Sequence, residues 1–308
     1  MKVIHASADL GQISGPVSLA IGVFDGVHLG HQQVIREAAA EAATHGGAAV
    51  VVTFDRHPNA VVAPSAVPPL IYPLSKKLKV LASLGLEAAY VIHFDRAFSK
   101  IPAADFVRGL ARDCGKIRGI SVGKSFVFGW RRDGNVALLQ ELGREMGFAV
   151  HPLGEISWQG QSVSSTRVRE AVRAGEFDAA GQMLGRPYAL CGQVVQGAGL
   201  GHQLGVPTAN LELTGLLTPP PGVYAARAHV RGQAHAAAVN IGFRPTLGQA
   251  DPQLQVEAHL LDFVADIYGE EMELVFEAKL RDEQKFGSLA ALREQILRDI
   301  QGVRRLLL

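Results

Sequence analysis

The 308-residue sequence is poor in cysteine and has no long apolar run. Its two cysteines, Cys114 and Cys191, are far apart, and neither has a partner at the spacing of a zinc site or a disulfide framework. Both are expected as reduced, buried thiols, which suits the cytoplasm. No apolar run approaches the roughly 18 residues of a membrane helix. His5 and Asp9 interrupt the N-terminus before the apolar segment of a signal peptide develops. We expect a soluble, cytoplasmic protein with no membrane partner.

An excess of charge of one sign is also absent. Lys and Arg number 30 and Asp and Glu 29, which gives a formal net charge of +1, and no long single-sign block occurs. The electrostatic footprint of a nucleic-acid-binding protein is therefore missing, and we expect no nucleic acid as a partner. Hydrophobic residues make up 48% of the chain, which allows buried cores, and the length suits two domains. The oligomeric state is left open.

Strand and helix signals alternate through the first half of the chain. Strands are expected at residues 19–24, 48–54, 89–94, 119–123 and 148–152. Helices are expected at residues 32–45, 74–84, 102–114, 136–146, 165–174 and 177–184. Such alternation predicts βαβ units around a parallel, Rossmann-like sheet of the nucleotidyltransferase type. Ligands on such sheets bind beyond the carboxyl ends of the strands.

The composition and the predicted secondary structure of the sequence change at Gly185. From residue 188 to 281 the chain consists of short β segments separated by Gly and Pro, which predicts a small β-barrel. Residues 225–230 and 236–241 are expected to pair, with 231–233 as their turn, and residues 254–263 and 272–280 follow as strands. A C-terminal amphipathic helix with Ser288 as N-cap closes the chain. Its apolar stripe consists of Leu289, Leu292, Ile296, Ile300 and Val303. We expect two domains, residues 1–184 and 185–308.

The N-terminal domain carries a run that is suited to phosphate. His28 and His31 surround Gly30 where an apolar strand should turn into a helix. A helix N-terminus offers unpaired N–H groups and partial positive charge, two imidazoles can donate hydrogen bonds to phosphate oxygens, and Gly30 leaves room for adenosine. The pattern predicts nucleotidyl transfer, with charge on the departing pyrophosphate stabilised without a covalent intermediate. The alternative is a pair of surface histidines, which the preceding Gly22–Gly26 run, with Phe24 in it, makes less attractive.

Two further runs in this domain are candidates. Hydroxyl and basic side chains at a helix start could hold the β- and γ-phosphates of a nucleotide, although Ser and Thr also cap helices there; these are Ser164, Ser165, Thr166 and Arg169. Phe126 and Phe128, in the run from residue 122 to 135, could line an aromatic ligand pocket. Aromatic residues at alternate positions also occur in ordinary cores.

The C-terminal domain has a glycine-rich segment that ends at Gly201 and precedes Thr208 and Asn210. Glycines let backbone amides approach phosphates. In an extended segment Thr208 and Asn210 point to the same face, and their oxygens are hard ligands suited to Mg²⁺ with a nucleotide. A glycine-rich barrel turn is the alternative. Strand alternation places Glu257 on one face with Gln255 and His259, either as solvent-facing polar groups or with Glu257 as the general base of a kinase.

Taken in order and spacing, these runs resemble the bacterial bifunctional riboflavin kinase/FAD synthetases over nearly the whole chain. The resemblance rests on residues 22–31, 53–58, 122–135, 164–169, 201–211, 240–248, 256–263 and 280–286. It implies that the barrel phosphorylates riboflavin to FMN with ATP and Mg²⁺, and that the N-terminal domain adenylylates FMN to FAD and releases pyrophosphate. Riboflavin, FMN, FAD and ATP are the implied small-molecule partners.

The resemblance also implies roles for particular residues. In the N-terminal domain His28 and His31 stabilise the transferring phosphates, and nucleotide-side positions include Gly22, Phe24 and Gly30. The second nucleotide-binding run of the family is matched by Ser164, Ser165, Thr166 and Arg169. The flavin side is matched by Ser125, Phe126 and, in the barrel domain, Arg281. The kinase site is matched by Gly201, Thr208, Asn210 and the catalytic base Glu257.

The chain departs from the family pattern at three positions. Ser125 stands where Asn or Asp is usual, His202 replaces an Arg, and Arg56 replaces a Pro. The first two bear on the relative efficiency of the two activities, because a shorter side chain or a titratable charge alters how substrate is held. The runner-up function is therefore a riboflavin kinase with an impaired adenylyltransferase domain. A flavin-binding regulator without catalysis and a nucleic-acid-binding barrel are the alternatives from other classes.

Overall fold

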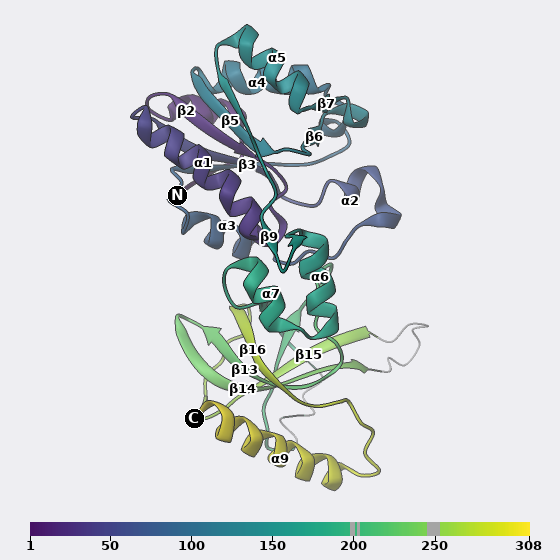
Figure 1. The fold of residues 1–308 in the computed structure, drawn as a ribbon. Coiled ribbons are helices and arrows are strands. Elements are labelled where there is room, and N and C mark those ends of the chain that lie inside the picture. Colours follow the sequence, from purple (N-terminus) through teal and green to yellow (C-terminus); the bar gives the residue numbers. More distant parts are fainter. Residues whose placement is uncertain (198–200, 202–203, 245–252) are drawn as a thin grey trace. The chain divides into compact units, whose positions relative to one another are not determined.

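A computed structural model describes residues 1–197, 201, 204–244 and 253–308 of the chain. The chain divides into two compact units, Met1–Ser165 and Thr166–Leu308 (Figure 1). The division falls at the first residue of a helix, ahead of the change of composition at Gly185.

A six-stranded parallel sheet forms the centre of the first unit. Its strands are β1 (Lys2–Ile4), β2 (Val17–Ile21), β3 (Ala48–Phe54), β4 (Ala88–Ile92), β5 (Ile117–Gly123) and β8 (Ala149–Leu153). They lie in the order β1-β4-β3-β2-β5-β8, and every neighbouring pair is parallel. The chain runs from β2 outward to β4 on one side and from β5 to β8 on the other. The strand order therefore reverses beside β2, where ligands of such sheets bind. The predicted Rossmann-like sheet is confirmed.

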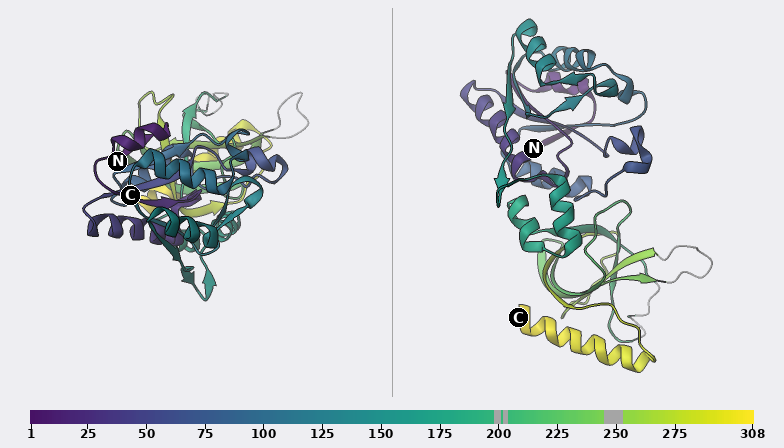
Figure 2. Two further views of the ribbon diagram at one scale, coloured as in Figure 1. Left: turned by 90° about the horizontal axis from the view of Figure 1, so that it is seen from above. Right: turned by 45° about the vertical axis from the view of Figure 1, so that its right-hand side comes forward.

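Helices cover both faces of this sheet (Figures 1 and 2). On one face are α1 (Leu29–Thr44) and α3 (Leu74–Ala82), and on the other are α4 (Ala103–Cys114) and α5 (Val136–Met146). The short helix α2 (Asn59–Val62) has no buried residue and covers neither face. Alternate residues of one strand enter different cores, because side chains alternate across a sheet. Leu19 packs with residues of α4 and α5, whereas Ala20 packs with residues of α1 and α3. The edge strand β1 and two hairpins were not predicted: β6 (Val127–Phe128) with β7 (Gly134–Asn135), and β9 (Ser157–Trp158) with β10 (Gln161–Ser162).

The second unit is a closed antiparallel barrel with helices before and after it. Helices α6 (Ser165–Ala174) and α7 (Phe177–Leu184) precede the strands. The strands are β11 (Ala189–Val195), β12 (Ala209–Glu212), β13 (Gly222–Val230), β14 (Gln233–Arg244), β15 (Gln253–Leu260) and β16 (Glu271–Arg281). They close in the order β11-β12-β15-β14-β13-β16. Helix α9 (Leu289–Leu307) lies outside the barrel against β13 and β14 (Figure 2). The predicted barrel and C-terminal helix are confirmed.

Two local predictions in this unit need correction. Val230 pairs with Gln233, so the turn is only Arg231-Gly232, and Gln233 already belongs to the strand. Both turn residues have positive φ, 51° and 76°, which is the two-residue hairpin turn that matches strand twist. Leu289 was expected on the buried stripe of α9 but is 60% exposed. It precedes the part of the helix that packs on the barrel core, where Val303 is buried.

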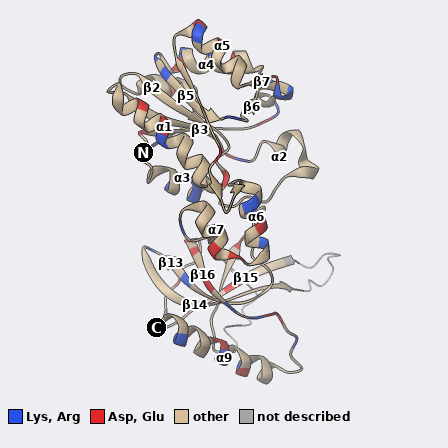
Figure 3. Ribbon diagram, viewed as in Figure 1, with Lys and Arg blue, Asp and Glu red and all other residues tan. Residues whose placement is uncertain are grey.

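Ser288 caps α9 as predicted, because its Oγ accepts a hydrogen bond of 3.2 Å from the Ala291 N–H. Basic and acidic residues are interspersed along the elements of each unit (Figure 3). Within the described ranges, no helix is long and apolar enough to cross a membrane.

Candidate active sites

The histidine pair lies at the start of α1, directly after the turn that follows β2. His28 is the N-cap of α1, and its Nδ1 accepts a hydrogen bond of 3.4 Å from the His31 N–H. The two imidazole rings stack with centroids 3.6 Å apart. A methyl group on Gly30 would lie 3.3 Å from the His28 ring, so a side chain there would crowd the imidazole. Both histidines thus stand at a helix N-terminus beside the switch point of the sheet.

The turn that leads into the histidines is strained. Phe24 and Val27 have φ of 52° and 42°, a left-handed region that is uncommon for aromatic and β-branched residues. The buried Phe24 ring packs edge-on against His31 at 5.3 Å, and a methyl group on Gly22 would lie 3.0 Å from the Phe24 ring. Strain of this kind persists only where surrounding structure holds it, and it gathers at functional sites.

Side chains from several elements hold this turn in place. Asp25 is buried, and its carboxylate accepts hydrogen bonds from the Ile71 N–H at 3.0 and 3.3 Å. The Ser165 hydroxyl donates to the Asp25 carbonyl at 2.9 Å. The Gln32 amide donates to the Val27 carbonyl at 3.0 Å. The strained backbone is therefore fixed on both sides of Gly26.

An aromatic cavity of about 430 Å³ opens at the same edge of the sheet, past the ends of β2 and β3. Phe126 and Phe128 stack at 5.0 Å, and the Phe128 ring lies edge-on to Phe106. The lining also includes Val23, Phe54, His57, Phe98, Arg131 and Arg132. A cavity with this lining suits a flat aromatic ring. Ser125 is exposed, and the described lining does not include it.

The other residues of the N-terminal prediction are spread over two units. Ser164 is half-buried and Ser165 holds the Asp25 carbonyl, both in the first unit. Thr166, which is exposed, and Arg169, which is buried, belong to the second unit.

The barrel brings the C-terminal candidates together on its outer face. Asn210 and Asn240 both stand opposite Glu257 in the strand ladder, on β12 and β14. Residues that face one another across antiparallel strands project to the same side. The predicted alternation along β15 is confirmed, because Val256, Ala258 and Leu260 are buried in the barrel while Glu257 is half-buried on the other face.

A pocket of about 330 Å³ lies over this row of residues, between the barrel face and α9. Its described lining includes Gly201, Thr208, Asn240, Glu257, Arg281 and Asp299. Asn210 lines a neighbouring hollow with Gly197 and Gln255. A methyl group on Gly201 would lie 2.9 Å from Thr208 Oγ1, and one on Gly197 would overlap the Asn210 carboxamide. The two glycines thus pack directly on the two proposed ligands. His202 lies outside the described residues.

Arg281 is held rigidly at the rim of this pocket. Its guanidinium donates three hydrogen bonds of 2.9–3.1 Å to the Asp299 carboxylate, and Gln295 donates a fourth at 2.8 Å to the same group. The Arg281 guanidinium also lies 5.7 Å from the Phe286 ring.

Sequence reasoning did not assign Asn240 or Asp299 to the site. The signal for Asp299 was a lone acidic residue inside the apolar stripe of α9, between Ile296 and Ile300.

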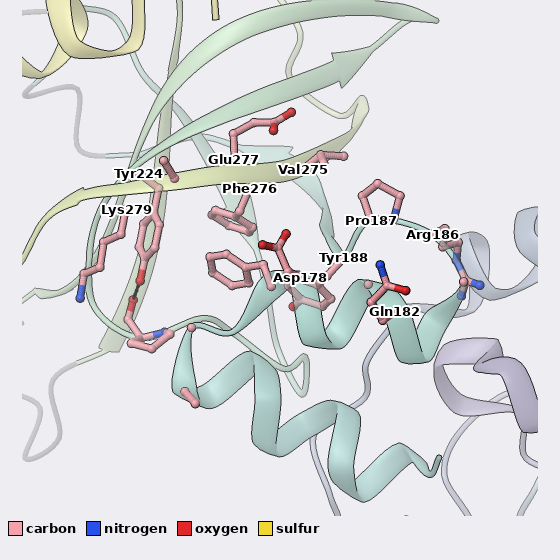
Figure 4. A pocket seen from close by; sticks show the side chains of 17 residues that line it. Asp178, Gln182, Arg186, Pro187, Tyr188, Tyr224, Val275, Phe276, Glu277 and Lys279 are labelled. Carbon is pink, nitrogen blue, oxygen red and sulfur yellow. Dashed lines mark hydrogen bonds between the residues drawn. The ribbon is translucent and has the colours of Figure 1, made fainter. Parts of the chain in front are cut away.

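A larger cavity than these two, about 710 Å³, lies elsewhere in the second unit (Figure 4). It opens between α7 and β16, and the Tyr224 hydroxyl at its edge donates to the Pro220 carbonyl at 2.7 Å. None of the described residues that line it belongs to the predicted sites. The size of a cavity therefore does not identify the active site here. The two smaller cavities, which have convergent polar groups, are the better candidates for active sites.

Arg56, the third departure from the family pattern, pairs with Asp55 at 3.1 Å at the end of β3. Asp55 also accepts hydrogen bonds from His93 at 2.7 Å and from the Phe94 N–H at 3.0 Å. Arg56 therefore joins a local charge cluster and lies beside His57, which lines the aromatic cavity.

Comparisons with known proteins match the two halves of the chain to two different families. Residues 11–167 match the family model of FAD synthetase, and residues 184–307 match that of riboflavin kinase. A protein from Pseudomonas fluorescens called bifunctional riboflavin kinase/FMN adenylyltransferase is 36% identical to this chain. The match covers 93% of this chain and 91% of the relative. Its counterparts are 36% identical in Escherichia coli K12 (97% and 96%) and 33% in Bacillus subtilis (98% and 96%). A crystal structure described as a macrolide-efflux protein from Streptococcus pneumoniae matches with a TM-score of 0.80 and 28% identity over 99% of both chains.

The fold and the two matches define a two-domain transferase that acts on flavins with a nucleotide. The chain belongs to the bifunctional riboflavin kinase/FMN adenylyltransferase family. Enzymes of this family use ATP and typically a divalent metal ion.

Proposed function

We propose that the chain makes FAD from riboflavin in two transfers at two separate sites. Residues 185–308 transfer the γ-phosphate of ATP to riboflavin and give FMN. Residues 1–184 then transfer AMP from a second ATP to FMN, which gives FAD and pyrophosphate. The observation that carries the proposal is that each half of the chain has its own family match and its own cavity with convergent polar groups. No observation favours the alternative with an impaired adenylyltransferase.

In the kinase step, Glu257 accepts the proton of the primary hydroxyl of riboflavin as that oxygen attacks the γ-phosphorus. ADP leaves as the bond to its β-phosphate oxygen breaks. Arg281 contacts the flavin side, and its anchor to Asp299 supports this role because a fixed guanidinium orients a substrate without losing entropy on binding. Gly201 is the proposed nucleotide-side residue of this site.

Thr208 and Asn210 are the proposed ligands for Mg²⁺. Their oxygens fit the preference of Mg²⁺ for hard donors, and the bare backbones of Gly197 and Gly201 leave no side-chain bulk against them. When bound, the ion screens the phosphate charges of ATP.

In the adenylyl step, a phosphate oxygen of FMN attacks the α-phosphorus of ATP, and the bond to pyrophosphate breaks. His28 and His31, with the N–H groups of α1, donate to the phosphate oxygens as negative charge moves to the leaving group. The flavin ring lies in the aromatic cavity with Phe126. Ser125, which stands outside the described lining of that cavity, is a further proposed contact of the flavin.

The remaining nucleotide contacts follow the same proposal. Gly22, Phe24 and Gly30 line the adenosine side, where Gly30 leaves space beside the His28 ring. The β- and γ-phosphates are bound by Ser164, Ser165, Thr166 and Arg169.

The proposed location is the cytoplasm. Cys114 and Cys191 are both buried, and neither forms a disulfide bond within the described residues. Burial, reinforced by the Asp113 charge, raises the pKa of the Cys114 thiol to about 12. A thiol that is not ionised and not exposed takes no part in exchange, which suits a reducing compartment.

One assay tests the function directly. The pure protein is incubated with riboflavin, ATP and Mg²⁺, and the flavins are separated over time. We expect FMN to rise first and FAD to follow at its expense. FMN that accumulates without FAD, even when FMN is supplied as substrate, would favour the impaired alternative. No turnover of either flavin would indicate a binding protein.

A further inference from the structure

A buried lysine lies beneath the N-terminal site. Lys77, on α3, is 8% exposed. Its ammonium donates to the Phe54 carbonyl at 2.8 Å, the Thr53 hydroxyl at 3.2 Å and the Val23 carbonyl at 3.3 Å. An ammonium has three N–H donors, so all three are used on protein acceptors.

These acceptors belong to the ends of two neighbouring strands. Phe54 is the last residue of β3, and Val23 follows β2 and begins the strained turn that leads to His28. Val23 and Phe54 both line the aromatic cavity. The Thr53 hydroxyl also donates to the Val23 carbonyl at 3.1 Å. Lys77 therefore ties the floor of the cavity to the start of the histidine turn.

Two carboxylates stabilise the positive charge of Lys77, which burial disfavours. Burial lowers the pKa of Lys77 to about 8, and the charges of Asp25 and Asp55 oppose that shift. Asp25 faces it from the turn, and Asp55 from the end of β3, where Asp55 itself pairs with Arg56 and His93. A neutral amine has only two N–H donors. Deprotonation thus leaves one of the three acceptors without its bond.

We propose that Lys77 is a positioning residue for adenylyl transfer, which holds the flavin cavity and the histidine turn at a fixed separation. The inference rests on the proposed adenylyl step in residues 1–184. Lys77 touches neither substrate in this scheme. It acts through Val23 and Phe54, because displacement of the acceptor phosphate from the histidines by about 1 Å can lower the rate about 100-fold. Binding of FMN alone depends on the aromatic walls and changes less.

The test compares Lys77→Met with Lys79→Met, an exposed lysine on the same helix. Adenylylation of supplied FMN, FMN binding and riboflavin phosphorylation are measured on each full-length protein. For Lys77→Met we expect kcat for FAD synthesis to fall about tenfold or more, with the Kd of FMN within about threefold of the wild type. Riboflavin phosphorylation serves as the internal control and should not change. Lys79→Met should match the wild type throughout.

A pH profile separates positioning from stability. The wild-type kcat for FAD synthesis should fall as pH rises through about 8, and the Lys77→Met profile should be flat there. The folded pKa lies below the ordinary value of 10.5, so the unfolded chain binds the proton more tightly between these values. Lys77 therefore makes the fold more stable as pH rises across that window, and unfolding through Lys77 cannot explain a loss of rate.

Three outcomes would overturn the proposal: full FAD synthesis by Lys77→Met, an equal loss of rate in Lys79→Met, or a wild-type rate that is flat through pH 8. If Lys77→Met does not fold, the pH profile of the wild type tests the proposal instead. The wild-type kcat must then fall as pH rises through about 8, while the Kd of FMN stays unchanged. A wild type that makes no FAD at any pH refutes the proposed function and this inference with it. Unimpaired FAD synthesis by Lys77→Met refutes the inference alone.

Discussion

The pair formed by Arg281 and Asp299 gives a prediction whose size follows from the structure. Asp299→Asn keeps the side-chain shape and one carbonyl acceptor but removes the negative charge. The side chains of Arg281 and Asp299 are 19% and 8% exposed, so solvent screens the lost charge little. Removing one partner of such a buried pair costs about 3–5 kcal/mol. The amide retains part of the bonding, so we expect a loss of about 2–3 kcal/mol in the free energy of unfolding of the second unit.

At roughly 3 °C per kcal/mol for a unit of this size, the melting temperature should fall by roughly 6–9 °C. Calorimetry of the whole chain should show this in the transition of the second unit only. The KM for riboflavin should rise, because Arg281 loses its anchor, while FAD synthesis from supplied FMN persists. The matched control is Glu294→Gln, which breaks an exposed pair with Arg298 on the same helix and should cost under about 1 kcal/mol. An Asp299→Asn protein with the melting temperature and KM of the control would refute the reasoning.

The remaining predictions concern the two active sites. Glu257→Ala should abolish FMN formation while FAD synthesis from supplied FMN continues, as flavin separation would reveal; loss of both in a folded protein contradicts the division of labour. His28→Ala combined with His31→Ala should have the reverse effect in the same assay, and surviving FAD synthesis would remove the histidines from the mechanism. Gly201→Val should displace Thr208, and we expect a rise in the KM for ATP of the kinase reaction of about tenfold or more; an unchanged KM would show that the close packing at Gly201 is irrelevant to ATP.

Much of the fold could be predicted from local patterns. Residues 48–54 form a strand with the predicted bounds, and residues 136–146, 165–174 and 177–184 form helices with theirs. The three helices are bounded by glycine or capping residues, and their apolar residues recur with the helical period. The strand is instead a short continuous apolar run that follows a glycine, which is typical of a strand buried on both faces. The capped α9 was predictable for the same reason as the three helices. The edge strand β1, which was not predicted, has only three residues and shows no periodic pattern.

Interactions across long sequence separations could not be predicted in this way. A pattern that assigns Lys and Asp to solvent misses Lys77 and Asp299, because each is buried and bonded to partners on elements far away in the sequence. The row that joins Asn210, Glu257 and Asn240 depends on strand register, which local sequence does not specify. The left-handed backbone conformation of Phe24 depends on hydrogen bonds that distant residues make to its turn, and the local sequence gives no sign of it.

The central claim is that one chain performs two transfers from ATP, each of a different part of the nucleotide. Parallel reactions on riboflavin with ATP labelled at the γ-phosphate or at the α-phosphate test it most directly. The γ-label should appear in FMN and remain in FAD, whereas the α-label should appear in FAD and never in FMN. Alpha-label in FMN, or FAD that carries the α-label without the γ-label, would contradict the account.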